Sequence, residues 1–169
     1  PARAQNDFGD APLSYLTTLI GGGPVHIASP TIYLGAGVDT EPDGFPGPSA
    51  TGDDLSGNDD EDGVQIYSSA PDRIVGMQIG AWSQLQVLVH RVPVTFAAYL
   101  NVWIDFSRDG DFADANERIA TNLMVFDGLQ EIGFFTPLTA ASGPTYARIR
   151  LSDIPLPAGA GLGIGGFAG

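Results

Sequence analysis

From Val64 onward the sequence alternates apolar and polar residues, and this period of two limits the possible folds more than any other feature. The clearest runs are Gln84–Arg91, Ala98–Phe106 and Tyr146–Leu151. Successive side chains of a β-strand point to opposite faces, so such alternation is typical of strands with one buried and one solvated face. The sequence therefore predicts an all-β protein built from half-buried strands.

Turn signals indicate how these strands connect. Two further strand-like runs, residues 119–126 and 129–135, are separated by Asp127-Gly128, which predicts a tight hairpin because glycine accepts a positive φ. Residues 112–118 could form a helical turn at most. Short antiparallel strands with turns between them favour an antiparallel β-sandwich, and an eight-stranded barrel is the alternative.

The chain reads as one domain, residues 1–169, with three textures. Residues 1–63 are a long loop-rich segment, dense in Gly, Pro and Asp, and residues 64–157 carry the main strands. Residues 158–169 form a Gly-rich tail, predicted to be a loop or an arm because glycine weakens a strand. The 23 Gly and 13 Pro of the whole chain also favour many short strands over helices.

The charge balance narrows the class of partner. The chain has 20 acidic residues against 7 cations, all of them arginine, for a net charge of −13. Nucleic acids and anionic lipids require clustered cations, so neither is an expected partner, and no apolar run is long enough for membrane insertion. With no cysteine, a disulfide framework is excluded. An acidic excess suggests Ca²⁺, which prefers carboxylate and carbonyl oxygens.

The most specific motif is the segment 105–117. Oxygen-bearing side chains recur at alternate positions around Gly110, and a downstream acid follows one place later than in an EF-hand loop. A solvated acidic turn is the plain alternative, but five acids in thirteen residues would repel one another without a cation. The motif therefore predicts a calcium loop without the EF-hand fold. The expected ligands are Asp105, Ser107, Asp109, Asp111 and Glu117.

A second acidic cluster spans residues 52–63, with Asp39, Glu41 and Asp43 shortly before it. It could form one or more calcium sites, or it could be a flexible acidic linker, because its spacing defines no order of ligands. The candidate ligands in this cluster are Asp53, Asp54, Asp59, Asp60 and Asp62.

Enzymatic motifs are scarce, and we expect no catalysis. His26 and His90 are the two histidines, and His90 falls on the polar face of a predicted strand. A pair of catalytic carboxylates remains conceivable from the number of acids alone. Trp82, Trp103 and Tyr99 could form a platform for stacking sugars, or one Trp could be core and the other a cross-strand packing residue.

Several ordered blocks resemble the GEVED-type domain of bacterial extracellular and surface proteins. They include Asp7-Phe-Gly-Asp-Ala-Pro12, Asp60-Glu-Asp-Gly-Val64, Leu100-Asn-Val-Trp-Ile-Asp-Phe106, Asp109-Gly-Asp111 and Tyr146-Ala-Arg-Ile-Arg-Leu-Ser152. The resemblance implies an accessory module outside the cell or on its surface, without catalytic activity. The family pattern closes with a Gly-Glu-Val-Glu-Asp-Tyr segment, whereas this chain stops at Phe167-Ala-Gly169.

We therefore expect a calcium-stabilised structural or adhesive module, with a calcium-dependent carbohydrate-binding module as the alternative. The expected partners are further copies of the chain, other surface proteins or glycans. If the terminal strand is missing, a neighbour's residues 1–8 or its tail could fill the gap, and repetition of that contact would grow a filament.

Overall fold

The computed structural model describes residues 6–38, 40–52, 63–68 and 73–157, and its regular structure is almost entirely antiparallel β. One named element is a short 3-10 turn, η1 (Leu13–Tyr15), and the described residues contain no α-helix. The strands are β1 (Asn6–Phe8), β2 (Val25–Ile27), β3 (Ile32–Leu34), β4 (Val64–Ser68), β5 (Trp82–Arg91), β6 (Ala98–Ile104), β7 (Arg118–Val125), β8 (Gly128–Phe135) and β9 (Ala147–Ser152).

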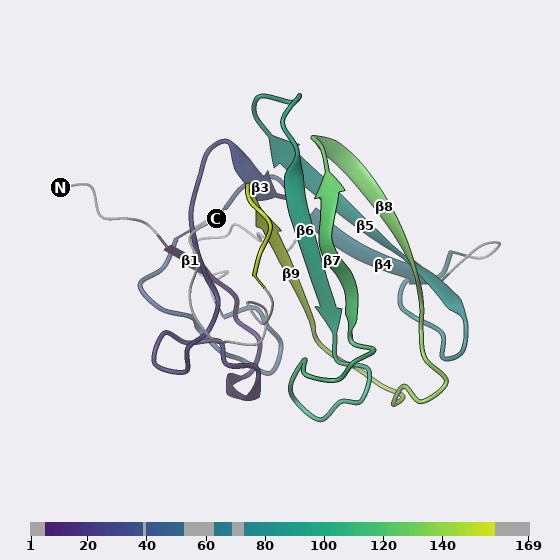
Figure 1. Ribbon diagram of the computed structural model, residues 1–169. Helices are drawn as coiled ribbons and strands as arrows, with labels where there is room; N and C mark the ends of the chain where they lie inside the picture. The colour runs from purple at the N-terminus through teal and green to yellow at the C-terminus, as the bar shows by residue number, and fades with distance from the viewer. Residues whose placement is uncertain (1–5, 39, 53–62, 69–72, 158–169) are drawn as a thin grey trace.

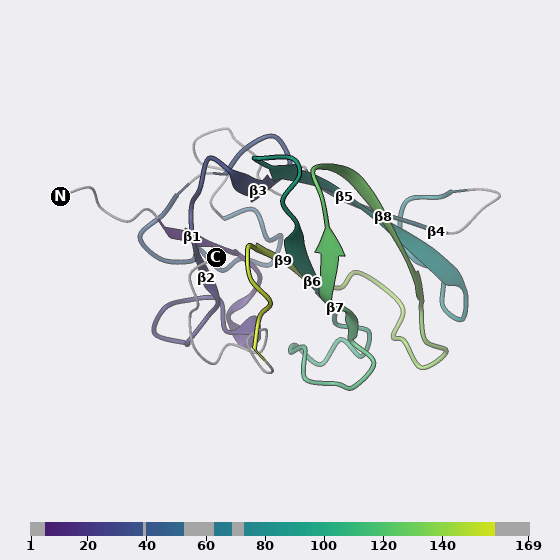
Figure 2. The same cartoon turned by 45° about the horizontal axis from the view of Figure 1, so that its top comes forward.

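Two sheets form the body of the protein. In the first, β5 is central: β8 pairs along one side of it, and β4 and β3 pair one after the other along its opposite side. In the second, β6 lies between β7 and β9. The two sheets lie in separate layers in both views (Figures 1 and 2). The main strands thus form two sheets, with β1 and β2 paired in a third, two-stranded antiparallel sheet. The barrel alternative does not describe this arrangement.

The inner faces of the two sheets enclose one apolar core. From β5 come Leu85, Val87 and Val89, and from β6 come alternate residues beginning at Ala98, all of them buried. These are the residues that the period of two assigned to the inner face. The arrangement is therefore sandwich-like and all-β, as predicted.

The prediction of half-buried strands is wrong for most of β6, because its second face is buried from Asn101 onward. Asn101 and Trp103 have exposed fractions of 0% and 1% on that face. A second apolar cluster covers it, in which Trp103 packs with Tyr15 from η1, with Phe112 and with Leu156. The N-terminal segment therefore forms an additional layer over the second sheet.

Asn101 shows how a polar residue is accommodated on the second face of β6. Its side-chain oxygen accepts hydrogen bonds from the Asn122 backbone N–H at 2.9 Å and from the Arg118 guanidinium at 2.6 Å. Its Nδ2 donates to the side-chain oxygen of Asn122 at 3.0 Å. Because a buried polar group destabilises the fold unless it is hydrogen-bonded, this network makes burial of Asn101 tolerable.

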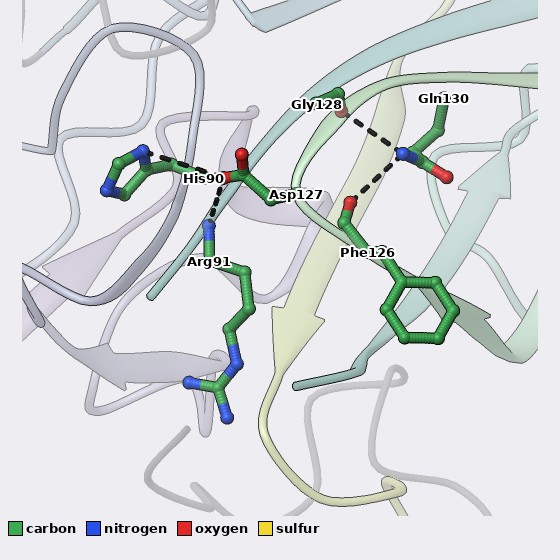
Figure 3. Close-up of polar contacts among 6 residues, drawn as sticks. All are labelled: His90, Arg91, Phe126, Asp127, Gly128 and Gln130. Carbon is green, nitrogen blue, oxygen red and sulfur yellow. Dashed lines mark hydrogen bonds and ion pairs between the residues drawn. The ribbon is translucent and has the colours of Figure 1, made fainter. Parts of the chain in front are cut away.

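The predicted hairpin at Asp127-Gly128 is also wrong. The connection is tight, with Gly128 at φ 103°, but β7 pairs with β6 while β8 pairs with β5, so the turn carries the chain from one sheet to the other. Figure 3 shows how the connection is held: the carboxylate of Asp127 accepts a hydrogen bond from the Arg91 backbone N–H at 2.8 Å and lies 3.8 Å from His90 Nδ1. The Gln130 amide donates to the carbonyl oxygens of Phe126 and Gly128.

Candidate metal centre

The loop that joins β6 to β7 carries the candidate site. It begins at Asp105, directly after β6, and ends at Glu117, directly before β7, so two paired strands fix both ends. Two residues within it, Arg108 and Gly110, have positive φ values of 60° and 95°, which fold the chain back sharply. A Cβ at Gly110 would lie 3.1 Å from the Ser14 hydroxyl oxygen, so both the backbone conformation and the close packing favour glycine there.

Three of the predicted ligands come together in this loop. Asp105, Asp109 and Glu117 each offer a carboxylate oxygen, and these oxygens lie within 4.8 Å of one another. Asp105 and Glu117 are fully buried, whereas Asp109 is exposed. Three carboxylates at this separation match the hard oxygen ligands that Ca²⁺ takes, and an exposed third member leaves a route from solvent.

Asp105 is held as a carboxylate by its surroundings. Its Oδ2 accepts hydrogen bonds from the Tyr15 hydroxyl at 2.6 Å and from the Gly110 N–H at 3.1 Å. Its Oδ1 accepts from the Ser107 hydroxyl at 3.1 Å and from the Arg108 N–H. Burial by itself raises the pKa of Asp105, but these hydrogen bonds outweigh burial and lower that pKa below its ordinary value.

The carboxyl group of Glu117 is less completely hydrogen-bonded than that of Asp105. Its Oε1 accepts a hydrogen bond from the Ser107 N–H at 3.2 Å, whereas its buried Oε2 has no hydrogen-bond partner among the described residues. Burial raises the pKa of Glu117, and the nearby carboxylates of Asp105 and Asp114 raise it further. A buried oxygen without a partner destabilises the fold unless a proton or a cation compensates it. A cation bound between these acids would supply that compensation.

The other two predicted ligands have local roles. Ser107 hydrogen-bonds Asp105 through its hydroxyl group, so it orients a member of the cluster. The carboxylate of Asp111 accepts a hydrogen bond from the Ala113 N–H at 2.7 Å, and Asp111 lies outside the group of three acids. The structure therefore does not place Asp111 with the other acids.

The second acidic cluster falls largely outside the described residues. Asp53, Asp54, Asp59, Asp60 and Asp62 lie there, as does Asp39, so their part in a metal site stays a prediction. Asp43 is described, and its Oδ1 accepts hydrogen bonds from the backbone N–H groups of Leu19 and Gly44. Glu41 accepts one from the Phe8 N–H through Oε1. Both acids therefore organise the backbone of the N-terminal segment.

Sequence reasoning did not assign a role to Tyr15. Its hydroxyl group bonds Asp105, and its ring contacts Phe112, with 4.8 Å between the ring centroids. Arg148 from β9 donates to the Tyr15 carbonyl oxygen and lies 4.9 Å from the Phe112 ring centroid. No local signal could reveal this, because Tyr15 and Asp105 are 90 positions apart in the sequence.

The two tryptophans agree with the second alternative drawn from the sequence, in which one is core and the other packs across strands. Trp103 is core, with the Arg118 guanidinium 4.8 Å from its ring centroid, so its ring cannot contact a sugar. Trp82 is 60% exposed and packs edge to face against Phe135, its partner across β5 and β8, at 5.9 Å between centroids.

The two histidines lie in different surroundings. His26 accepts a hydrogen bond from Arg150, and burial together with that cation lowers the pKa of His26 to about 3. His90 stacks on Tyr33 at 4.3 Å between ring centroids.

Comparison with known proteins supports the predicted resemblance over part of the chain. Residues 99–164 match the GEVED domain, and this range includes β6 from its second residue, the loop with the three acids, and β7, β8 and β9. The blocks Asp7–Pro12 and Asp60–Val64 lie outside the matched residues. Neither the curated proteins nor the solved structures compared with this chain include a significant match. No helix among the described residues is long and apolar enough to cross a membrane.

Proposed function

We propose that this chain is a calcium-stabilised structural or adhesive module of an extracellular or cell-surface protein. The observation that supports calcium binding best is the buried Oε2 of Glu117, which lies without a hydrogen-bond partner among the described residues, within a group of three carboxylates. The match to the GEVED domain supports the location, because the resemblance implies a module of extracellular proteins.

Calcium fits this site better than other common metals. All the candidate side-chain ligands are oxygens, and the loop contains no histidine or cysteine, the preferred ligands of zinc. Ca²⁺ accepts irregular oxygen shells, completed by backbone carbonyls and water, whereas Mg²⁺ requires near-octahedral geometry. The role of the ion is structural: it neutralises the acids of the loop between β6 and β7. It thereby fixes the loop, whose Phe112 packs with Tyr15 and whose Asp105 is hydrogen-bonded by Tyr15.

In this proposal the protein performs no reaction. The acids of the loop are ligands, and copies of the chain or other surface proteins are the partners. Sedimentation velocity in calcium measures whether the isolated chain self-associates, and a monomer at high concentration would limit the proposal to contacts with other proteins.

Isothermal titration with CaCl₂ tests the metal site directly. Asp109→Asn keeps the shape of the exposed acid and removes its charge, so we expect calcium to bind at least about tenfold more weakly, a loss of about 1.4 kcal/mol. Asp153→Asn makes the same chemical change at an exposed position directly after β9, outside the loop, and should leave the affinity unchanged.

Two results would contradict the assignment. If the unaltered chain takes up no calcium, the three acids do not form a metal site. If the two variants bind calcium equally well, the ion lies elsewhere in the chain.

A further inference from the structure

We propose that the outer face of the first sheet binds a neutral polysaccharide chain. This outer face consists of the side chains of β4, β5 and β8 that point away from the core, and it is a different surface from the acidic loop. Its central residues are Trp82, Gln84 and Gln86 on β5, with Phe135 and Glu131 on β8 and Tyr67 on β4.

The strand register fixes the layout of the outer face. Trp82 is paired with Phe135 in one row; the next row pairs Gln84 with Gly133 and Tyr67; the third pairs Gln86 with Glu131 and Gln65. The intervening residues Ser83 and Leu85 are buried, which confirms that Trp82, Gln84 and Gln86 point away from the core. Rows two residues apart are separated by about 6.8 Å along an antiparallel strand, so the outer face is an extended surface.

Two exposed aromatic rings stand at one end of the outer face. Trp82 is 60% exposed and Phe135 is 45% exposed, and the two rings pack edge to face. Their arrangement leaves apolar ring surface in contact with water, which is unfavourable unless a ligand covers it. The C–H face of a pyranose ring is a suitable cover, because aromatic rings combine a large apolar area with a fixed geometry.

The centre of the outer face is polar but carries no net charge. The Gln86 amide donates to Glu131 Oε1 at 2.6 Å, and the Arg73 guanidinium lies 3.7 Å from the same oxygen. Gln84 and Gln86 each carry an amide, which can both donate and accept hydrogen bonds, as sugar hydroxyl groups do. The buried centre of a protein–protein interface is usually more apolar than this.

The charge of the outer face selects a neutral ligand. Arg73, from the connection between β4 and β5, reaches this face: its guanidinium is paired with Glu131 and lies 5.1 Å from the Tyr67 ring centroid. The outward-pointing side chains of β4, β5 and β8 include no arginine, so this face has no basic cluster for phosphate or sulfate groups. The net charge of the whole chain, −13, repels polyanions as well. A neutral polysaccharide is compatible with both facts.

Gly133 provides space beside the aromatic pair. It is exposed, and a Cβ built at this position meets nothing within 4 Å, while its backbone lies outside the left-handed region. A valine would therefore fit the strand, and its β-branched side chain suits strand geometry. The same side chain would stand beside Gln84, between the row of Trp82 and the row of Gln86, and would obstruct a sugar chain that crosses the rows.

The test uses native gels that contain hydroxyethyl cellulose, laminarin, galactomannan or dextran, run with calcium present. We expect at least one of these to retard the unaltered chain. Trp82→Ala and Gly133→Val should each weaken that binding by about tenfold or more. Phe96→Ala serves as the control, because Phe96 is similarly exposed, at 57%, but lies in the loop between β5 and β6.

Several outcomes would overturn the proposal. A fifth gel contains dextran sulfate, a polyanion. The proposal is overturned if none of the four neutral polysaccharides retards the chain, if dextran sulfate alone does so, or if Trp82→Ala and Phe96→Ala have equal effects. If the chain forms dimers that Trp82→Ala abolishes, and binds none of the polysaccharides, a second copy covers the outer face instead. Circular dichroism checks that Trp82→Ala and Gly133→Val are folded. Neither change should disturb the fold, because both positions are exposed.

Discussion

Replacing Glu117 by glutamine gives the sharpest test of the buried acid. Glutamine resembles the protonated carboxyl group in size and shape, so the substitution removes a charge without opening a cavity. Without calcium, Glu117→Gln should be at least as stable as the unaltered chain, because burial and the neighbouring acids already disfavour the charged form. With calcium, the variant should lose the stabilisation that the ion confers.

The expected size of that loss follows from mass action. An ion that binds only the native state, at about one hundred times its dissociation constant, stabilises by about 2.7 kcal/mol. For a chain of this length, about 1 kcal/mol corresponds to about 2 to 4 °C in Tm, so calcium should raise Tm by about 5 to 11 °C. Glu117→Gln should reduce this rise to near zero.

Differential scanning calorimetry at neutral pH, with calcium or with a chelator, measures both effects. Glu131→Gln is the matched control: the chemical change is the same, but Glu131 lies on the exposed face of β8 and should keep the full rise in Tm. An equal rise in Glu117→Gln and in the unaltered chain would refute the assignment of Glu117 as a ligand. If chelation leaves the Tm of the unaltered chain unchanged, the reasoning about the whole loop is wrong.

Two further predictions concern His26 and Tyr15. The pKa of His26 falls from 6.5 to about 3 on folding, so its contribution to stability is complete above pH 6.5 and is lost as the pH falls. Between pH 6.5 and pH 5 the unaltered chain should therefore lose about 2 kcal/mol more than His26→Gln in urea unfolding, and parallel pH profiles would contradict this. Tyr15→Phe removes the hydrogen bond to the buried Asp105 carboxylate and should cost about 1.5 to 3 kcal/mol in the free energy of unfolding. Tyr99→Phe, with a partly exposed ring on β6, should cost less than about 0.5 kcal/mol, and similar losses in both variants would argue against the role of Tyr15.

The sequence predicts the inner face of this fold well, because burial against a core imposes a period of two on β5 and β6. It does not predict that Asn101 and Trp103 are also buried. Trp103 is covered by Tyr15 of the N-terminal segment, from a distant part of the chain, and Asn101 is hydrogen-bonded by Arg118 and Asn122 of β7. Periodicity reports one face of a strand, and a second covering layer leaves no separate periodic signal.

Turn chemistry predicts the bend at Gly128 but not which strands it connects. A positive φ at glycine serves a hairpin and a crossing between sheets equally well, since both need a sharp change of direction. The choice of partner lies in long-range pairing, where β8 matches β5 over eight residue pairs.

The sequence likewise predicts only part of the candidate site. The spacing of acids around Gly110 predicts that Asp105, Asp109 and Glu117 meet. It does not predict that the Asp111 carboxylate accepts a hydrogen bond from the Ala113 N–H instead of joining the other acids. A short aspartate side chain readily bonds the backbone two residues ahead, and the spacing of acids gives no sign of which aspartate will do so.

The hydrogen bond from Tyr15 to Asp105 has a consequence for the timing of folding. It joins residues 90 positions apart, so the loop acquires its final shape only after the N-terminal segment has docked on the second sheet. Contacts between distant parts of a chain form late, and a ligand that recognises such contacts slows unfolding more than it speeds folding. Calcium should thus act mainly on how long each folded molecule survives. In the extracellular location proposed above, where proteases are present, that lifetime is more important than the equilibrium between folded and unfolded forms.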